Sequence, residues 1–333
     1  MGKRGLFLVV VVALVAGTGI SNGEVEVGTL LHDLHWGGDS CGAWGMPPLP
    51  CRCCVPGFSM DLGIRKFINS FCSYQFPDND TDTDPLSRLE FPIDNWFWGV
   101  QASQVFSNMC FSVEFWSRLN TRNALKMQDS DWGQFGFPGG QKTTFSESSQ
   151  RVADGWMVDV NVDYSLGPRL GACLRPVAGY SYKTFCFIAG DGFQYSLNPA
   201  SQGPLNGDTF DVRFTFQHLY IGGRACFSLG RLGLTLQADY GWVGAKEVDQ
   251  HLLRGDRLTK DTDGGSCWHL FASMGMVVRD SLSLRLESDF KRLVVLNCNH
   301  YWNEGDGTPI QTWWGAKIWS DQQSVAGYAE FRF

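Results

Sequence analysis

The sequence predicts an exported, all-β chain that forms a ten-stranded antiparallel transmembrane β-barrel in a bacterial outer membrane. Three observations predict this fold: a short apolar segment at the N-terminus, recurrent alternation of apolar and polar residues, and a last strand that ends in Phe333. The composition agrees, because 14% of the residues are aromatic, 39 are glycine and the mean hydropathy is only -0.15. This profile is typical of many strands joined by tight turns.

The N-terminal segment has the features of a secretory signal peptide. Lys3 and Arg4 precede an uncharged apolar run over residues 6–15, and small and polar residues at 21–23 provide a cleavage site. A spanning helix needs about 20 apolar residues, so this run is too short to be one. We therefore expect a signal peptide over 1–23, an extension rich in Cys, Gly and Pro over 24–56, and the barrel over 57–333.

Strict alternation with a period of two marks the strands. In residues 282–291, Leu284 and Leu286 alternate with Arg285 and Glu287, and residues 111–120 and 156–164 follow the same pattern. A soluble sandwich would bury the apolar face in a core, whereas a membrane barrel turns it to lipid and lines its lumen with the polar face. The polar faces carry both charge signs, the apolar faces are rich in aromatics, and residues 328–333 form an alternating strand closed by a terminal Phe. These features favour the barrel, which must close because lipid tolerates no open sheet edge.

Ten strands account for the pattern, with centres at 58–75, 87–104, 109–126, 154–165, 170–188, 208–226, 231–250, 265–278, 282–297 and 320–333. Short turns at 107–108, 165–168, 228–230 and 280–281 alternate with long polar connections at 76–86, 128–153, 189–207, 251–264 and 298–319. Outer-membrane barrels have short periplasmic turns and long extracellular loops. We therefore expect the long connections to face the cell exterior and both chain ends to lie on the periplasmic side.

Charge and cysteine content limit the partners. The chain has 27 Lys and Arg against 34 Asp and Glu, a formal net charge of -7, so nucleic acid is not expected as a partner. It also has 11 cysteines, and export to an oxidising compartment makes disulfides plausible. The odd number leaves a free thiol or an intermolecular disulfide, and the connectivity stays open.

Two acidic motifs could support chemistry. Asp129 and Asp131 follow the third strand, while Asp249 and His251 end the seventh, and both strands run toward the extracellular side. Because side chains alternate between the two faces of a strand, Glu247, Asp249 and His251 should all point inward from the seventh strand. An Asp two residues before a His can orient the imidazole and raise its basicity. Such a site would activate water for attack on a carbonyl, whereas the simpler alternative is an ion pair without catalytic function. The sequence contains no HExxH, phosphate-loop or dinucleotide-binding motif, so no metal site is expected.

At these motifs the chain resembles the omptin family of outer-membrane endopeptidases. The resemblance is carried by residues 127–132 (MQDSDW) and 241–251 (GWVGAKEVDQH), and more weakly by residues 61–74, 87–90 and 327–333. It implies an aspartyl-type protease with a ten-stranded barrel, in which Asp129 and Asp131 polarise a water molecule. His251, oriented by Asp249, would take the proton of that water as it attacks a peptide or protein substrate.

The resemblance also implies a specificity pocket and an activator. Glu247 occupies the position of one acidic pocket residue, and an ungapped alignment of residues 63–74 places Phe71 at the other, which would relax selection for Lys or Arg. No cofactor is implied, but lipopolysaccharide would be required on the barrel exterior, with Lys183 and Arg213 as candidate phosphate contacts. The competing function is a non-catalytic barrel that acts as an adhesin or as a structural envelope protein cross-linked through its cysteines.

Overall fold

The computed structural model describes residues 56–78, 83–120, 125–169, 172–253, 257–303 and 311–333. The expected signal peptide and nearly all of the extension over 24–56 lie outside these ranges. No helix in the described part has the length and hydropathy needed to cross a membrane. The strands are β1 (Gly57–Phe67), β2 (Phe71–Asp78), β3 (Thr83–Pro92), β4 (Trp96–Phe106), β5 (Met109–Arg118), β6 (Met127–Trp132), β7 (Lys142–Tyr164), β8 (Pro168–Arg169), β9 (Ala172–Ser196), β10 (Gly203–Leu229), β11 (Leu232–His251), β12 (Arg257–Arg279), β13 (Leu282–Asn303) and β14 (Gln311–Arg332). Two short 3-10 turns, η3 (Gln134–Gly136) and η4 (Pro199–Ser201), complete the described elements.

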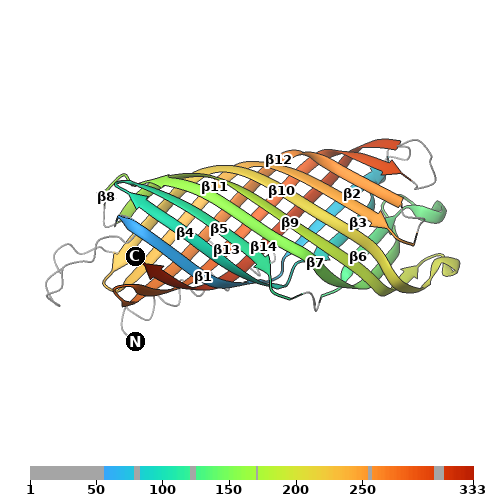
Figure 1. Ribbon diagram of the computed structural model, residues 1–333. Helices are drawn as coiled ribbons and strands as arrows, with labels where there is room; N and C mark the ends of the chain where they lie inside the picture. The colour runs from blue at the N-terminus through green and yellow to red at the C-terminus, as the bar shows by residue number, and fades with distance from the viewer. Residues whose placement is uncertain (1–55, 79–82, 121–124, 170–171, 254–256, 304–310) are drawn as a thin grey trace, which may run out of the picture. The chain divides into compact units, whose positions relative to one another are not determined.

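These strands form one antiparallel sheet that closes on itself (Figure 1). The ring runs β1–β4–β5–β7–β9–β10–β11–β12–β13–β14 and is closed because β14 pairs with β1. At the end of the barrel away from the C-terminus, β2, β3 and β6 take the place of β1, β4 and β5 between β14 and β7. We call this end the rim, and the opposite end, which carries the short turns at 107–108, 230–231 and 280–281, the turn end.

The predicted ten-stranded barrel is confirmed once three interruptions are recognised. β1 and β2, β3 and β4, and β5 and β6 are three long strands, each broken by a short irregular segment, and β7 and β9–β14 supply the other seven. At the first break Asn69 adopts a left-handed backbone (φ 50°), which Asn tolerates better than most residues. The Asp94 carboxylate accepts from the backbone N–H of Ser70 at 3.0 Å, so the first two breaks support each other.

The predicted long connections are wrong, because most of their residues extend the strands toward the rim. β7 begins at Lys142, β9 runs to Ser196, β10 begins at Gly203, and β13 runs to Asn303. Toward the rim the inner face of β7 is small and polar: Thr144, Ser146 and Ser148 point inward and are buried, yet they have the composition of a loop. A pattern that relies on apolar residues facing lipid therefore stops where the lipid-facing surface stops.

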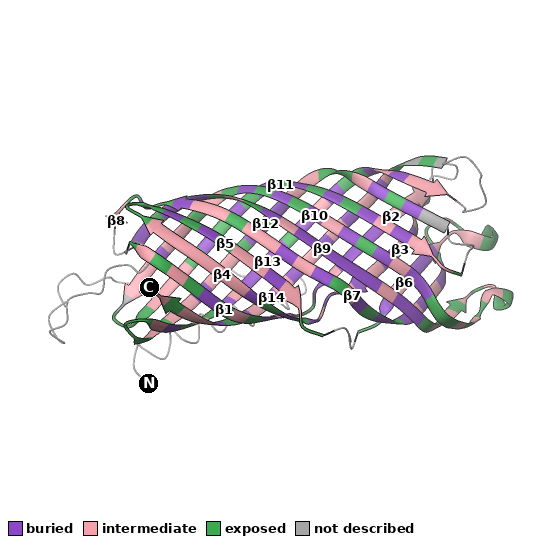
Figure 2. Cartoon of the chain, viewed as in Figure 1, coloured by how far each residue is buried: buried purple, intermediate pink, exposed green. Residues whose placement is uncertain are grey.

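Outward side chains on the turn-end half are large and apolar, as a lipid-facing surface requires. This apolar belt includes Leu62, Ile64, Trp98, Val113, Leu219, Ile221, Trp242, Trp268, Leu270, Leu284 and Leu286, all exposed. Figure 2 shows exposed and buried residues alternating along the strands. On β11 the outward residues beyond Trp242 are Gly244, Lys246, Val248 and Gln250, none of which is a large apolar side chain exposed like Trp242, so the rim half of this strand lies outside the apolar belt.

An aromatic layer fills the lumen below the rim. Its members are phenylalanines no more than 1% exposed: Phe67, Phe91, Phe97, Phe185, Phe187, Phe214 and Phe216. Neighbouring ring centroids lie 5.2–6.5 Å apart, within the range of favourable aromatic pairs. The lumen at this level is therefore a packed core, which supports the rim from below.

Charged side chains fill the lumen between the aromatic layer and the turn end. Asp163 accepts from Arg175 Nε and from Arg224 Nη1, both at 2.6 Å, while His269 lies between Asp239 (2.6 Å) and Asp289 (2.8 Å). Buried charges are tolerated when they are paired and hydrogen bonded, and this arrangement meets that condition. The mixed charges seen on the polar faces of the strands therefore hold the barrel wall together from inside.

Candidate active site

The seventh long strand, β11, brings a histidine and an aspartate together at the rim. Alternation turns Glu247 and Asp249 inward, where both are completely buried, and His251 is the last residue of the strand. His251 Nε2 lies 2.9 Å from Asp249 Oδ2, and the His251 side chain is 13% exposed. A buried carboxylate thus orients an imidazole that still reaches solvent, which is the arrangement of a general base.

Tyr74 supports this pair from the opposite wall. It points inward from β2, is fully buried, and its hydroxyl donates to the same Asp249 Oδ2 that contacts His251. Burial raises the pKa of Tyr74 well above its ordinary value, and the negative charges of Asp249, Glu247 and Asp129 add to the effect. Tyr74 therefore remains a hydrogen-bond donor to Asp249 at neutral pH, although no motif in the sequence singled it out.

The two aspartates of the other motif lie on strand β6, which corrects their expected position in a loop. Asp129 pairs with Leu89 and Ser146, and Asp131 pairs with Ser87 and Thr144. Residues two apart on a strand share a face, so both carboxylates belong to the same side of β6. β6 continues the long strand that begins as β5, on the rim side of the break between them.

A cavity of about 280 Å³ connects the two motifs. Asp129 and His251 both line it, together with Ser146, Gln194, Leu205, Thr209, Phe210 and Leu253. Phe210 lies opposite His251 on the neighbouring strand and holds the imidazole edge-on, with ring centroids 4.6 Å apart. The structure thus brings Asp129, His251 and, through His251, Asp249 to one site, while Asp131 lies further along β6 and does not line the cavity.

Next to Asp249 lies a buried acidic cluster that we define as Glu247, Asp249 and Asp261. Glu247 faces Asp261 across the β11–β12 pair, all three carboxylates are 0% exposed, and neither oxygen of Glu247 has a side-chain hydrogen-bond partner among the described residues. Burial, reinforced by the charges of Asp261 and Asp249, raises the pKa of Glu247 well above its ordinary value. Burial also raises the pKa of Asp261, against the opposing effect of His300. Glu247 and Asp261 therefore hold protons that isolated carboxyl groups would release.

Asp261 and His300 were missed by sequence reasoning. His300 Nδ1 lies 2.6 Å from Asp261 Oδ1, and its ring stacks on Phe76 with centroids 5.0 Å apart. Glu247, Asp261 and His300 occupy three neighbouring strands in register. The only signal that could have found them is that register, and it was hidden because residues 251–264 were expected to be a loop.

Phe71 does not reach this cluster, which corrects the expected specificity pocket. It pairs with Asp321 and Pro92, whereas Cys72 and Tyr74 are the inward residues of β2 and pair with the inward Ser320 and Ile318. The turn at 68–70 shifts the parity of the chain between β1 and β2, so an ungapped alignment through it carries Phe71 to the wrong face. The inward aromatic residue nearest to Asp249 is Tyr74.

The two expected lipopolysaccharide contacts lie on opposite sides of the wall. Lys183 is 5% exposed inside the lumen, where its Nζ donates to Gln322 Oε1 at 2.6 Å. It therefore cannot meet a ligand on the barrel exterior, because parity turns it to the same side as Phe185 and Phe187. Arg213 points outward and is exposed.

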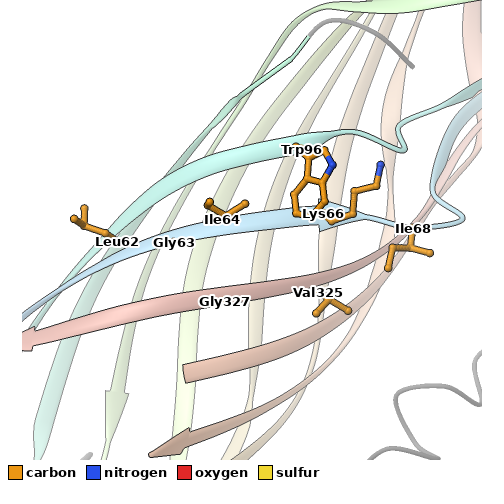
Figure 3. A pocket seen from close by; sticks show the side chains of 8 residues that line it. All are labelled: Leu62, Gly63, Ile64, Lys66, Ile68, Trp96, Val325 and Gly327. Atoms are coloured by element: carbon orange, nitrogen blue, oxygen red, sulfur yellow. The ribbon is translucent and has the colours of Figure 1, made fainter. Parts of the chain in front are cut away.

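A separate groove of about 810 Å³ lies on the outside of the barrel (Figure 3). It is lined by Leu62, Ile64, Ile68, Trp96 and Val325, with Lys66 at its edge and Gly63 and Gly327 in its floor. The groove belongs to the apolar belt and contains none of the acidic or histidine side chains of the rim. It is therefore a feature of the lipid-facing surface and not part of the candidate site.

Comparison with known proteins identifies the family and the fold. The family model described as the Omptin family matches residues 71–307. No curated protein matches the sequence. Among solved structures, the outer membrane protease OmpT from Escherichia coli superposes with a TM-score of 0.76 at 15% identity, covering 83% of this chain and 97% of that one. The translocator domain of the autotransporter NalP from Neisseria meningitidis covers 84% of this chain at 8% identity, but with a TM-score of only 0.36.

The family match spans most of the barrel and includes both motifs, from Asp129 to His251. The structural match extends over nearly the whole of the OmpT chain, so the ten-stranded topology is shared as well. The resemblance first noted in a few short stretches therefore holds for the chain at large. This chain is a member of the omptin family and an outer-membrane protein.

Proposed function

We propose that this protein is a surface endopeptidase that hydrolyses peptide bonds with a water molecule held between Asp129 and His251. The observation that carries the proposal is that these two residues, from strands far apart in the sequence, line one cavity. The buried Asp249 and the hydroxyl of Tyr74 lie directly behind His251.

The arrangement suggests the following roles. With Nε2–H donating to Asp249, Nδ1 is the nitrogen of His251 that can accept a proton from water. The water oxygen then attacks the peptide carbonyl, and the imidazolium formed is stabilised by the Asp249 carboxylate. The same proton is next transferred to the amine as the C–N bond breaks. Asp129, assisted by Asp131, would hold the water and orient it toward the carbonyl.

The acidic cluster supports a preference for a positively charged side chain beside the scissile bond. Glu247 and Asp261 face each other, and no Lys or Arg among the described residues forms an ion pair with either, so a Lys or Arg of the substrate would supply that charge. Because Phe71 lies on the other face of β2, the expectation of relaxed selection has lost its structural basis. We therefore propose selection for a basic residue.

We further propose that the rim faces the cell exterior and that lipopolysaccharide is required for activity. The apolar belt ends on the rim side at Trp242 and Trp268, so the site stands clear of the membrane. Arg213 points outward beyond that level and is the remaining candidate for a phosphate contact.

The test is cleavage of a peptide library by refolded protein, with and without lipopolysaccharide. We expect wild type to cleave next to basic residues, and His251→Ala and Asp129→Ala to lose at least about 100-fold in kcat, as removal of a general base or its water-binding partner does. Asp208→Ala is the matched control, because that carboxylate is half exposed and pairs with Arg151 on the surface. Equal cleavage by wild type and both site variants would refute the site. Absence of cleavage by wild type would favour a non-catalytic adhesin or structural role.

A further inference from the structure

Two cysteines face each other across adjacent strands near the turn end. Cys173 on β9 is the direct partner of Cys226 on β10, in a stretch of pairing that runs without a register shift from Phe210 and Ala189 to Phe227 and Ala172. Both side chains point into the lumen: Cys173 is 2% exposed and Cys226 is 5% exposed, whereas the adjacent Leu174 is 42% exposed. The two thiols therefore share one face at one level of the barrel.

This placement satisfies the distance requirement of a disulfide. Directly opposed residues of an antiparallel pair have Cα atoms about 4.5 or 5.5 Å apart, and disulfides bridge Cα atoms about 4.4–6.8 Å apart. The seven described cysteines are present as thiols, and each of the other five has residues other than cysteine as its strand partners. Among the described cysteines, strand register therefore places only Cys173 and Cys226 directly opposite each other.

The pair is also placed where an oxidant can reach it. Cys226 lines a cavity of about 200 Å³ at the turn end, together with Cys110, Arg231 and Arg332. A hydroxyl lies near each sulfur: Ser165 Oγ lies 3.1 Å from Cys173 Sγ, and Thr235 Oγ1 lies 3.8 Å from Cys226 Sγ.

We propose that Cys173 and Cys226 form a cross-strand disulfide in the exported protein. Each thiol loses a proton, the pair loses two electrons, and the S–S bond forms as a disulfide-bearing oxidant is reduced to two thiols by exchange. Such oxidants are available outside the cytoplasm, where an outer-membrane chain must pass. The bond ties β9 to β10 at the turn end, opposite to their connection at the rim.

Cys173 and Cys226 cannot take part in disulfides between two chains. Both point into the lumen, so a neighbouring molecule in the membrane cannot reach them. If intermolecular disulfides form, they must use other cysteines of the chain.

The test is disulfide mapping of the full-length, refolded protein. After equilibration with oxidised glutathione, the chain is denatured, treated with N-ethylmaleimide, digested without reduction and analysed by mass spectrometry. We expect a linked peptide pair containing Cys173 and Cys226, and a loss of at least about tenfold in their alkylated forms compared with a reduced sample. Complete alkylation of both cysteines in the oxidised sample, or linkage of Cys226 to Cys110, would overturn the proposal.

Two cysteine variants give a second test of the pairing. Cys173→Ser should leave Cys226 fully alkylated after oxidation, while Cys267→Ser, which removes a thiol from another strand pair, should keep the linked peptides. If Cys173→Ser failed to fold, the mapping of wild type and of Cys267→Ser would still decide. A link that persisted between other cysteines in place of this one would also count against it.

Discussion

Replacing Tyr74 with Phe tests how the histidine is held. The hydroxyl of Tyr74 and Nε2 of His251 both contact Asp249 Oδ2, and Tyr74 is fully buried against Phe214. Phe keeps the ring and its packing and removes only the donor. A hydrogen bond to a charged group contributes about 1.5–3 kcal/mol, and each 1.36 kcal/mol corresponds to a tenfold change in rate. If the full free energy of this hydrogen bond is lost from the transition state, kcat falls roughly 10- to 150-fold.

The assay is steady-state cleavage of a peptide substrate identified from the library. We expect KM to change much less than kcat, because Tyr74 contacts the positioning carboxylate and not the cavity that would hold the substrate. Tyr180→Phe is the matched control, since Tyr180 points outward and is 42% exposed. Folding of both variants is checked by the mobility of unheated samples on gels. A folded Tyr74→Phe protein with kcat within about twofold of wild type would show that the hydroxyl does not hold the pair.

Three further predictions concern stability. Because the pKa of Glu247 is raised, the native state keeps a proton that the unfolded chain has released, so stability falls as pH rises from the ordinary glutamate value through the raised one. Glu247→Gln should remove up to about 1.4 kcal/mol per pH unit of this slope in urea unfolding, and an unchanged slope would contradict the shift. A Cβ at Gly99 would lie 2.4 Å from the ring of Trp116, so Gly99→Ala should cost about 1–3 kcal/mol, whereas Gly223→Ala, with open space, should cost little. Asp163→Asn leaves the buried Arg175 and the partly buried Arg224 without their shared carboxylate and should destabilise by about 3–5 kcal/mol; a stability equal to wild type would show that the lumen tolerates their charge.

The strand count could be predicted because the apolar belt imposes a simple rule on residues such as Leu284 and Leu286. Lipid on one side and packed polar side chains on the other leave a period of two in the sequence. Above the belt the rule fails, since water meets the outer face and small polar residues such as Ser146 fill the inner one. For this reason β6 and the rim half of β7 were mistaken for loops.

Some residues of the candidate site could be predicted from the alternation of side chains, and others could not. The alternation of side chains on β11 continues unbroken from the apolar belt to the rim, so it predicts that Glu247, Asp249 and His251 point inward. The structure shows them in this orientation. Their roles in catalysis stay a prediction, as do those of Asp129 and Asp131. Asp261 and His300 depend on pairing between strands, which no local pattern reveals.

Phe71 shows that one irregular turn is enough to make the alternation of side chains a wrong guide to which face a residue lies on. The left-handed backbone at Asn69 changes the face on which the following residues lie, and nothing in residues 68–70 marks the change as clearly as Gly or Pro would. Lys183 was expected to contact phosphate because it is basic, but the local sequence does not show that its partner is Gln322, which lies far along the chain.

The aromatic layer has a consequence for how the barrel behaves in a membrane. Tightly packed phenylalanine rings exclude water and offer no site to an ion, so the layer makes the lumen an electrical insulator. A peptide that enters the rim must leave by the same mouth, and its fragments stay on the side from which it came. Planar bilayers that contain the purified protein should accordingly show no stepwise conductance, and thinning the layer with Phe185→Ala is the substitution most suited to open a leak.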